Sequence, residues 1–254
     1  MSIINLYSLI TAIFVGGAAG YVGSLMLTKR MALVGDAFGH VALPGMGLAL
    51  LFGLNVSLGA FAFLFLGVLA VWFLEPKTQL PAETLVGIIF VLSLAVGFLI
   101  TPEPELLEAL FGDISKVSFW GTAISAVASV LIGLTVWKIY PKITLGSISE
   151  DIAAANKINI KKYNFIYLLM VAVVVALGVR IVGSLLAGAL VIVPAAAARL
   201  VSANLRQYAA FSAGFGVLSC IFGILLAQAI NFSAGPIIIL VCSFFFLIAL
   251  VFKK

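Results

Sequence analysis

The chain has 254 residues, of which 64% are apolar and only 9% are charged, and its mean hydropathy is +1.31. Soluble domains carry about 25% charged residues, and a soluble fold of this size would leave much of its apolar surface in water. The composition therefore excludes a soluble protein and predicts an all-α polytopic membrane protein. The net charge of +5 is typical of basic cytoplasmic loops rather than of a nucleic-acid-binding surface.

Nine apolar runs approach or exceed the length of about 20 residues that a helix needs to cross a bilayer. In chain order they are 5–27, 32–53, 56–75, 84–100, 117–139, 163–179, 182–200, 207–230 and 234–252. Nine spans use about 180 residues and leave about 74 for loops, so we expect a single transmembrane domain over residues 1–254. The short run at 84–100 and a further apolar stretch at 105–112 leave a bundle of eight or ten helices open.

The basic residues predict the orientation of these spans. If the loop at 140–162 is cytoplasmic, twelve of the 14 Lys and Arg residues are cytoplasmic, and only Lys116 and Arg180 lie outside. This asymmetry agrees with the positive-inside rule and predicts an N-terminus outside and a C-terminus in the cytoplasm. The outer loop at 101–116 is instead acidic, with Glu103, Glu105, Glu108 and Asp113.

The second run contains two side chains suited to chemistry, Asp36 and the only histidine, His40. A spacing of four residues places both on one face of a helix. An ionisable group inside a bilayer costs at least ~2.5–3.5 kcal/mol and usually faces a cavity or a partner. The simpler interpretation is a hydrogen bond that holds the bundle together. The functional interpretation is a metal or proton site, since carboxylate oxygen and imidazole nitrogen suit Zn²⁺ or Mn²⁺ and a two-fold dimer would supply two of each.

Other features of the sequence are typical of packing. Small residues recur four apart, a spacing that lets helices approach closely in a membrane. These pairs are Gly16 with Gly20, Gly35 with Gly39, and Ser184 with Gly188. Cys220 and Cys242 lie in apolar runs and are expected to be buried thiols. No G-x-x-x-x-G-K-[ST] motif is present, which argues against ATP hydrolysis through a phosphate-binding loop of this chain.

The segment 140–162 is the most polar stretch of the chain. Ser147 or Ser149 is expected to cap a short helix that runs through Glu150 and Asp151. Two interpretations of this segment stay open at this point. It is either an ordinary connection between spans or a helix that docks on a cytoplasmic partner.

Four stretches carry a resemblance to a known family. They are RMALVGDAFGHVALPGMGLALLFG at 30–53, ETLVGIIFVLSLAVG at 83–97, LLEALFGDISKVS at 106–118 and VGSLLAGALVIVPAAAARLVS at 182–202. The chain resembles the integral membrane permease of bacterial ABC transporters for zinc, manganese and iron(II), in matching order from about residue 5 to residue 250. The GD-x-x-x-H and L-x-IP-A-x-x-AR motifs are its most specific parts, and Val193 replaces the usual Ile of the second motif.

This resemblance implies the permease subunit of an ATP-driven importer in the cytoplasmic membrane of a bacterium. Two permease subunits would form the pathway as a homodimer surrounded by membrane lipid. Separate cytoplasmic ATPase subunits would bind ATP, and an extracytoplasmic metal-binding protein would deliver the ion. The chain itself would then be no enzyme, hold no permanent cofactor and bind no nucleic acid.

The resemblance also implies roles for particular residues. Asp36 and His40 would be transient ligands of the transported ion. The stretch TLGSISEDIAAANKIN at 144–159, within the segment 141–162, resembles the coupling segment that docks on the ATPase. Its expected docking residues are Gly146, Ser147, Ser149, Glu150, Asp151 and Ala154.

A secondary, ion-coupled metal transporter is the alternative. It would also be a helix bundle with a buried Asp and His, but it would need no docking segment and often has inverted halves, which are not evident here. The motifs do not select among Zn²⁺, Mn²⁺ and Fe²⁺. Because protonation of His40 would remove its metal-binding lone pair, we expect uptake to fall as the pH drops below ~6.

Overall fold

The computed structural model describes residues 6–101, 110–112, 114 and 117–253. This described part contains no strand. Its helices are α1 (Leu6–Thr28), α2 (Leu33–Leu51), α3 (Val56–Thr78), α4 (Ala82–Ile100), α6 (Phe119–Ile148), α7 (Glu150–Ala155), α8 (Ile160–Val182), α9 (Ala187–Val201), α10 (Leu205–Ile230) and α11 (Ala234–Val251). The predicted all-α fold is confirmed.

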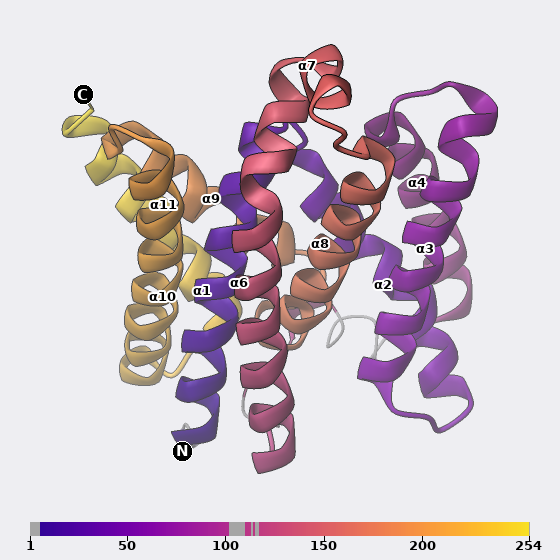
Figure 1. Cartoon of the computed structure of the whole chain (residues 1–254). Helices are drawn as coiled ribbons and strands as arrows, with labels where there is room; N and C mark the ends of the chain where they lie inside the picture. Colours follow the sequence, from indigo (N-terminus) through magenta and orange to yellow (C-terminus); the bar gives the residue numbers. More distant parts are fainter. Residues whose placement is uncertain (1–5, 102–109, 113, 115–116, 254) are drawn as a thin grey trace.

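Eight of the described helices are long and apolar enough to cross a membrane, and α9 is a shorter apolar helix of 15 residues. The two chain ends lie at opposite ends of the bundle, and α7 lies at the same end as the C-terminus (Figure 1). A helix of 15 residues is about 22 Å long, less than the ~30 Å of the hydrocarbon core. Eight of the nine predicted spans are thus long enough to cross, whereas α9 is not long enough by itself.

Close contact between α1 and α10 forms the centre of one half of the bundle. A Cβ atom on Gly20 would collide with the carbonyl oxygen of Ser212, and one on Gly216 would collide with the carbonyl oxygen of Gly16. The small residues of α1 therefore bring two helix backbones together, as their spacing predicts. The other half is built on α2, which packs against α3, α4, α8 and α9.

The predicted end of the fifth span at residue 139 is wrong, because α6 continues to Ile148 through Pro141. A proline removes one backbone donor and usually interrupts a helix. Here Tyr140 and Ile143 are both buried, so the apolar face of the helix continues across the proline. Gly146 and Ser147 consequently belong to α6 and not to a loop.

The predicted span at 182–200 also begins too early, because a turn at Gly183 separates α8 from α9. Gly183 has a φ angle of +84°, and a Cβ atom there would collide with the carbonyl oxygen of Leu110. Only glycine fits such a position readily. Most of the short helix expected at 105–112 and the acidic residues of the outer loop lie outside the described residues.

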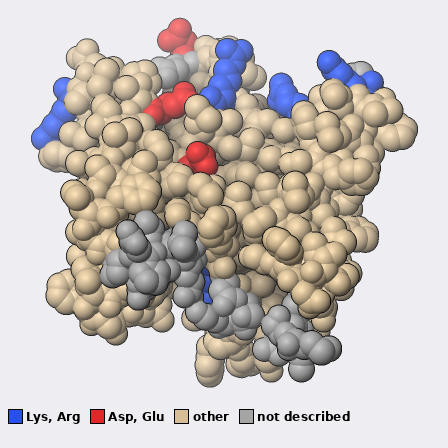
Figure 2. Space-filling model, turned by 180° about the vertical axis from the view of Figure 1, so that it is seen from behind, with Lys and Arg blue, Asp and Glu red and all other residues tan. Residues whose placement is uncertain are grey.

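Positive charge gathers at the end of the bundle that carries α7, where most of the Lys and Arg surface is seen (Figure 2). By the order of the helices, Arg180 near the end of α8 lies at the opposite end. The described basic residues at the α7 end are Lys29, Arg30, Lys77, Lys138, Lys142, Lys157, Lys161, Lys162, Arg199, Arg206 and Lys253. This distribution is the one expected for a protein whose α7 end faces the cytoplasm.

Candidate metal site

Asp36 and His40 lie on adjacent turns of α2, and both are half-buried. Four residues advance an α-helix by about 6 Å and bring the two side chains to the same side. The structure therefore keeps the carboxylate and the imidazole on one side of α2, as their spacing predicts.

Asp36 is held against the start of α9. A Cβ atom on Gly188 would lie 2.5 Å from the Cα atom of Asp36, 2.6 Å from its nitrogen and 2.8 Å from its Cβ atom. One turn further along α2, a Cβ atom on Gly39 would lie 2.5 Å from the carbonyl oxygen of Ser184. The backbones of α2 and the segment 184–188 are thus in direct contact at Asp36 and Gly39.

His40 faces a different neighbour. Its ring lies 5.3 Å, centroid to centroid, from that of Phe90 on α4, with an angle of 50° between the ring planes. Its Nδ1 atom is buried and has no hydrogen-bond partner among the described residues. A buried polar atom without a partner is costly, and such atoms often mark places where a ligand or water binds. The simpler interpretation, an imidazole engaged only in holding the bundle together, leaves this nitrogen unexplained.

The described residues contain no cluster of three or more His, Cys, Asp and Glu side chains able to hold a metal ion. Asp36 and His40 therefore supply two donors, whereas zinc sites usually have three or four protein ligands. Such a pair is suited to weak, transient binding by one chain. A second chain related by two-fold symmetry would double the number of donors.

The structure adds Ser184 to the surroundings of this pair. Its hydroxyl oxygen is fully buried and has no hydrogen-bond partner among the described residues. In the sequence, the spacing of four residues between Ser184 and Gly188 predicts only close packing, and the structure shows that packing. No local pattern marks its hydroxyl, because the proximity of Ser184 to Gly39 is a contact between distant parts of the chain.

The expected docking residues lie at the α7 end of the bundle, away from Arg180. Ser149 is the cap of α7, since its hydroxyl accepts a hydrogen bond from the backbone nitrogen of Ile152 at 3.3 Å. Ser147 does not cap this helix, because its hydroxyl donates to the carbonyl oxygen of Ile143 at 2.9 Å. Asp151 and Ala154 are exposed on α7. The predicted short helix is thus present, with Ser149 rather than Ser147 at its start.

Comparison with known proteins yields a family match and full-length relatives. Residues 4–253 match the ABC 3 transport family. The manganese transport system membrane protein MntC of Listeria monocytogenes is 30% identical over 252 residues, which cover 96% of this chain and 89% of that protein. The high-affinity zinc uptake system membrane protein ZnuB of Haemophilus influenzae is 28% identical over 252 residues, with 97% and 96% covered.

A solved structure shares this arrangement of helices. PsaBC from Streptococcus pneumoniae in complex with Fab superimposes with a TM-score of 0.82 at 30% sequence identity. The similarity covers 95% of this chain and 89% of the matched chain. The similarity therefore extends over nearly the whole bundle.

Proposed function

The chain belongs to the ABC 3 transport family, and we propose that it is the permease subunit of an ATP-driven importer for a divalent transition-metal ion. Zn²⁺ and Mn²⁺ are the principal candidates, because the relatives above are named as zinc and manganese systems. Fe²⁺ is a further candidate with similar ligand chemistry. The secondary-transporter alternative is not favoured by these relatives.

The observation that carries the assignment of the ion path is the pair on α2. Asp36 offers carboxylate oxygens, and His40 has a buried ring nitrogen without a partner among the described residues. In a homodimer, two such pairs meeting at the symmetry axis would provide four donors, enough for a transition-metal ion. Weak ligation by each chain would allow the ion to leave again.

The proposed mechanism is alternating access. An extracytoplasmic metal-binding protein delivers the ion at the end of the bundle that carries Arg180. Separate ATPase subunits bind and hydrolyse ATP, and they dock on α7 at the other end through the residues around Ser149. Closure of the ATPase pair displaces α7 and, through the continuous helix α6, tilts the bundle about the ion site. In this orientation the N-terminus is outside and the C-terminus is cytoplasmic.

The test is uptake of labelled Zn²⁺, Mn²⁺ and Fe²⁺ by cells that express the chain with its cognate ATPase and binding protein. Asp36→Ala and His40→Ala are compared with wild type at equal membrane levels. Glu75→Gln, which removes a carboxylate from the last turn of α3, is the matched control. We expect both site variants to lose uptake and the control to retain it, and the ion taken up fastest identifies the cargo.

Two results would contradict parts of this proposal. Normal uptake by both site variants would make the pair structural and would leave the permease assignment intact. Uptake that continues when the ATPase is absent would instead indicate a secondary transporter.

A further inference from the structure

An apolar groove lies at the α7 end of the bundle, on the side where α1 runs between α6 and α10 (Figure 1). Its volume is about 680 Å³, and pockets that bind small ligands usually have about 300–1,000 Å³. Tyr21 of α1 lines the groove together with residues of α6 between 137 and 148 and residues of α10 between 205 and 210. Three helices therefore form a groove large enough for a ligand.

The groove crosses the level at which the bilayer meets the cytoplasm in the proposed orientation. It follows α6 from Trp137, which is exposed near the end of the apolar part of that helix, to Ile148 at its last residue. These 11 residues span about 16 Å along the axis of a helix. Trp and Tyr side chains are typical of this boundary between lipid and water. A ligand that follows the groove would thus have one end among lipid chains and the other among polar groups.

Two hydroxyl groups on α6 have no hydrogen-bond partner among the described residues. Tyr140 is only 8% exposed, and its hydroxyl oxygen and that of Thr144 are both buried. The two residues stand four apart, on one side of the helix, and both line the groove. Because buried polar atoms are nearly always hydrogen-bonded, two such hydroxyls beside one groove indicate a polar ligand group there.

Arg206 is the charged residue of the lining, and it is exposed at the start of α10. A guanidinium has five donors in a fixed arrangement that suits phosphate oxygens, and each hydroxyl can donate one more hydrogen bond. The apolar walls exclude a purely polar anion as the natural occupant. The lining as a whole fits an amphiphile with an apolar chain and an anionic head.

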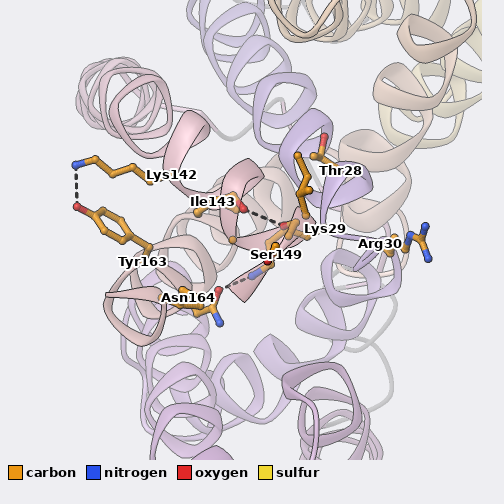
Figure 3. A pocket seen from close by; sticks show the side chains of 12 residues that line it. Thr28, Lys29, Arg30, Lys142, Ile143, Ser149, Tyr163 and Asn164 are labelled. Carbon is orange, nitrogen blue, oxygen red and sulfur yellow. Dashed lines mark hydrogen bonds between the residues drawn. The ribbon is translucent and has the colours of Figure 1, made fainter. Parts of the chain in front are cut away.

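A neighbouring cavity, between the ends of α1 and α6 and the start of α8, is less suited to such a ligand although Lys29, Arg30 and Lys142 line it. The ammonium of Lys142 donates a hydrogen bond to the hydroxyl of Tyr163, and that of Lys29 donates to the side-chain oxygen of Asn164. Figure 3 shows Arg30 and Lys142 directed away from each other. The basic side chains of that cavity therefore do not converge on one anion.

We propose that the groove between α6 and α10 binds an anionic phospholipid of the cytoplasmic leaflet. An acyl chain lies along the apolar walls, and the phosphate accepts hydrogen bonds from Arg206 and from the hydroxyls of Tyr140 and Thr144. Anionic lipids are abundant in that leaflet and favour basic sites between membrane helices. The proposal does not depend on which metal the protein carries. The bound lipid would connect α10 to α6, the helix that leads into the docking helix α7.

The test uses the fluorescence of Trp137, which lines the groove. Trp72→Phe with Trp120→Phe leaves Trp137 as the single tryptophan of the chain, because the sequence has three. The full-length protein is reconstituted in phosphatidylcholine vesicles that contain a small share of phosphatidylglycerol with brominated acyl chains, which quench a tryptophan that they touch. Brominated phosphatidylcholine at the same share measures random contact. A chain with Trp120 alone, at the other end of α6, is the matched reference.

We expect phosphatidylglycerol to quench Trp137 more than phosphatidylcholine does, and to quench Trp120 no more. Arg206→Gln should lower the apparent affinity for phosphatidylglycerol about fivefold. Lys162→Gln, which removes a positive charge at the same end but outside the groove, should leave that affinity unchanged. Tyr140→Phe keeps the ring that stacks on Tyr21 and should lower the affinity at least about twofold, because it removes one hydrogen bond to the head.

Other results would overturn the proposal. Equal quenching of Trp137 by the two brominated lipids, or equal effects of Arg206→Gln and Lys162→Gln, would exclude a specific site for an anionic lipid. Protection of Trp137 from both lipids would instead show that another protein chain covers the groove. That chain is the ATPase if Arg206→Gln lowers the amount of ATPase that co-purifies, and it is a second copy of the permease if Arg206→Gln lowers the amount of homodimer.

Discussion

Substitution of Gly188 by alanine tests whether the contact between α2 and α9 positions the proposed ion ligand. The added Cβ atom would lie 2.5 Å from the Cα atom of Asp36, whereas carbon atoms in contact prefer about 3.5–4.0 Å. The two helices would have to separate by about 1 Å or distort. Metal–ligand distances tolerate deviations of only about 0.2 Å, so such a shift would move the carboxylate of Asp36 out of ligating range.

The cost of this overlap can be bounded. Overpacking of a well-packed core costs about 1–3 kcal/mol, which corresponds to roughly 5- to 150-fold if it falls on ion binding. Total stabilities of about 5–15 kcal/mol leave most of the protein folded under this strain. We therefore expect Gly188→Ala to reach the membrane in nearly normal amounts and to take up metal at least about fivefold more slowly.

The assay is initial uptake of labelled Mn²⁺ and Zn²⁺, normalised to the amount of permease in the membrane. Gly214→Ala in α10 is the matched control, because a Cβ atom there would meet no heavy atom within 4 Å. Uptake by Gly188→Ala at the wild-type rate would refute the argument that this contact positions Asp36. Equal losses in both variants would indicate a general effect of removing glycine from the helices.

Three further predictions follow from other contacts. Gly20→Ala would push α1 away from the carbonyl oxygen of Ser212 and destabilise the bundle by about 1–3 kcal/mol. The unfolding temperature of this variant in detergent should therefore fall by several degrees, and an unchanged value would contradict the close contact of α1 with α10. Ser149→Ala removes the cap of α7, which stabilises a helix by about 1 kcal/mol. This variant should lower the metal-stimulated ATPase activity of the assembled transporter, whereas the control Ser147→Ala should not. Equal activities of the two variants would show that the cap does not matter for coupling. Lys157→Cys, at the turn after α7, should react with a membrane-impermeant maleimide only after the cell membrane is opened to expose its cytoplasmic side. The background should be low because both native cysteines are fully buried. Labelling of this variant in intact cells would reverse the proposed orientation.

Several features of the candidate site are predictable from local sequence. The spacing of Asp36 and His40 places them on one side of α2 whatever surrounds that helix, because the helical repeat alone determines it. The cap of α7 is also nearly predictable, because Ser147 and Ser149 both precede the acidic first turn of that helix. Only the unpredicted continuation of α6 excludes Ser147.

Other features of the candidate site and of the α7 end depend on residues that are distant along the chain. Gly188 contacts Asp36 across more than half of the sequence, and Ser184 approaches Gly39 in the same way. At the α7 end, hydrogen bonds join Lys29 to Asn164 and Lys142 to Tyr163. Each of these residues is unremarkable among its sequence neighbours, so no periodic pattern marks the group that they form.

The sequence by itself determines that the chain lies in a membrane, roughly where its helices run and which end is basic, because hydropathy and charge are properties of short segments. The tertiary structure alone decides that α6 continues past Pro141, that α9 is shortened by the turn at Gly183, and that the backbone of Asp36 lies against Gly188. These outcomes depend on packing between helices. The free energy gained by burying Tyr140 and Ile143 against neighbouring helices outweighs the local tendency of Pro141 to end the helix that contains it.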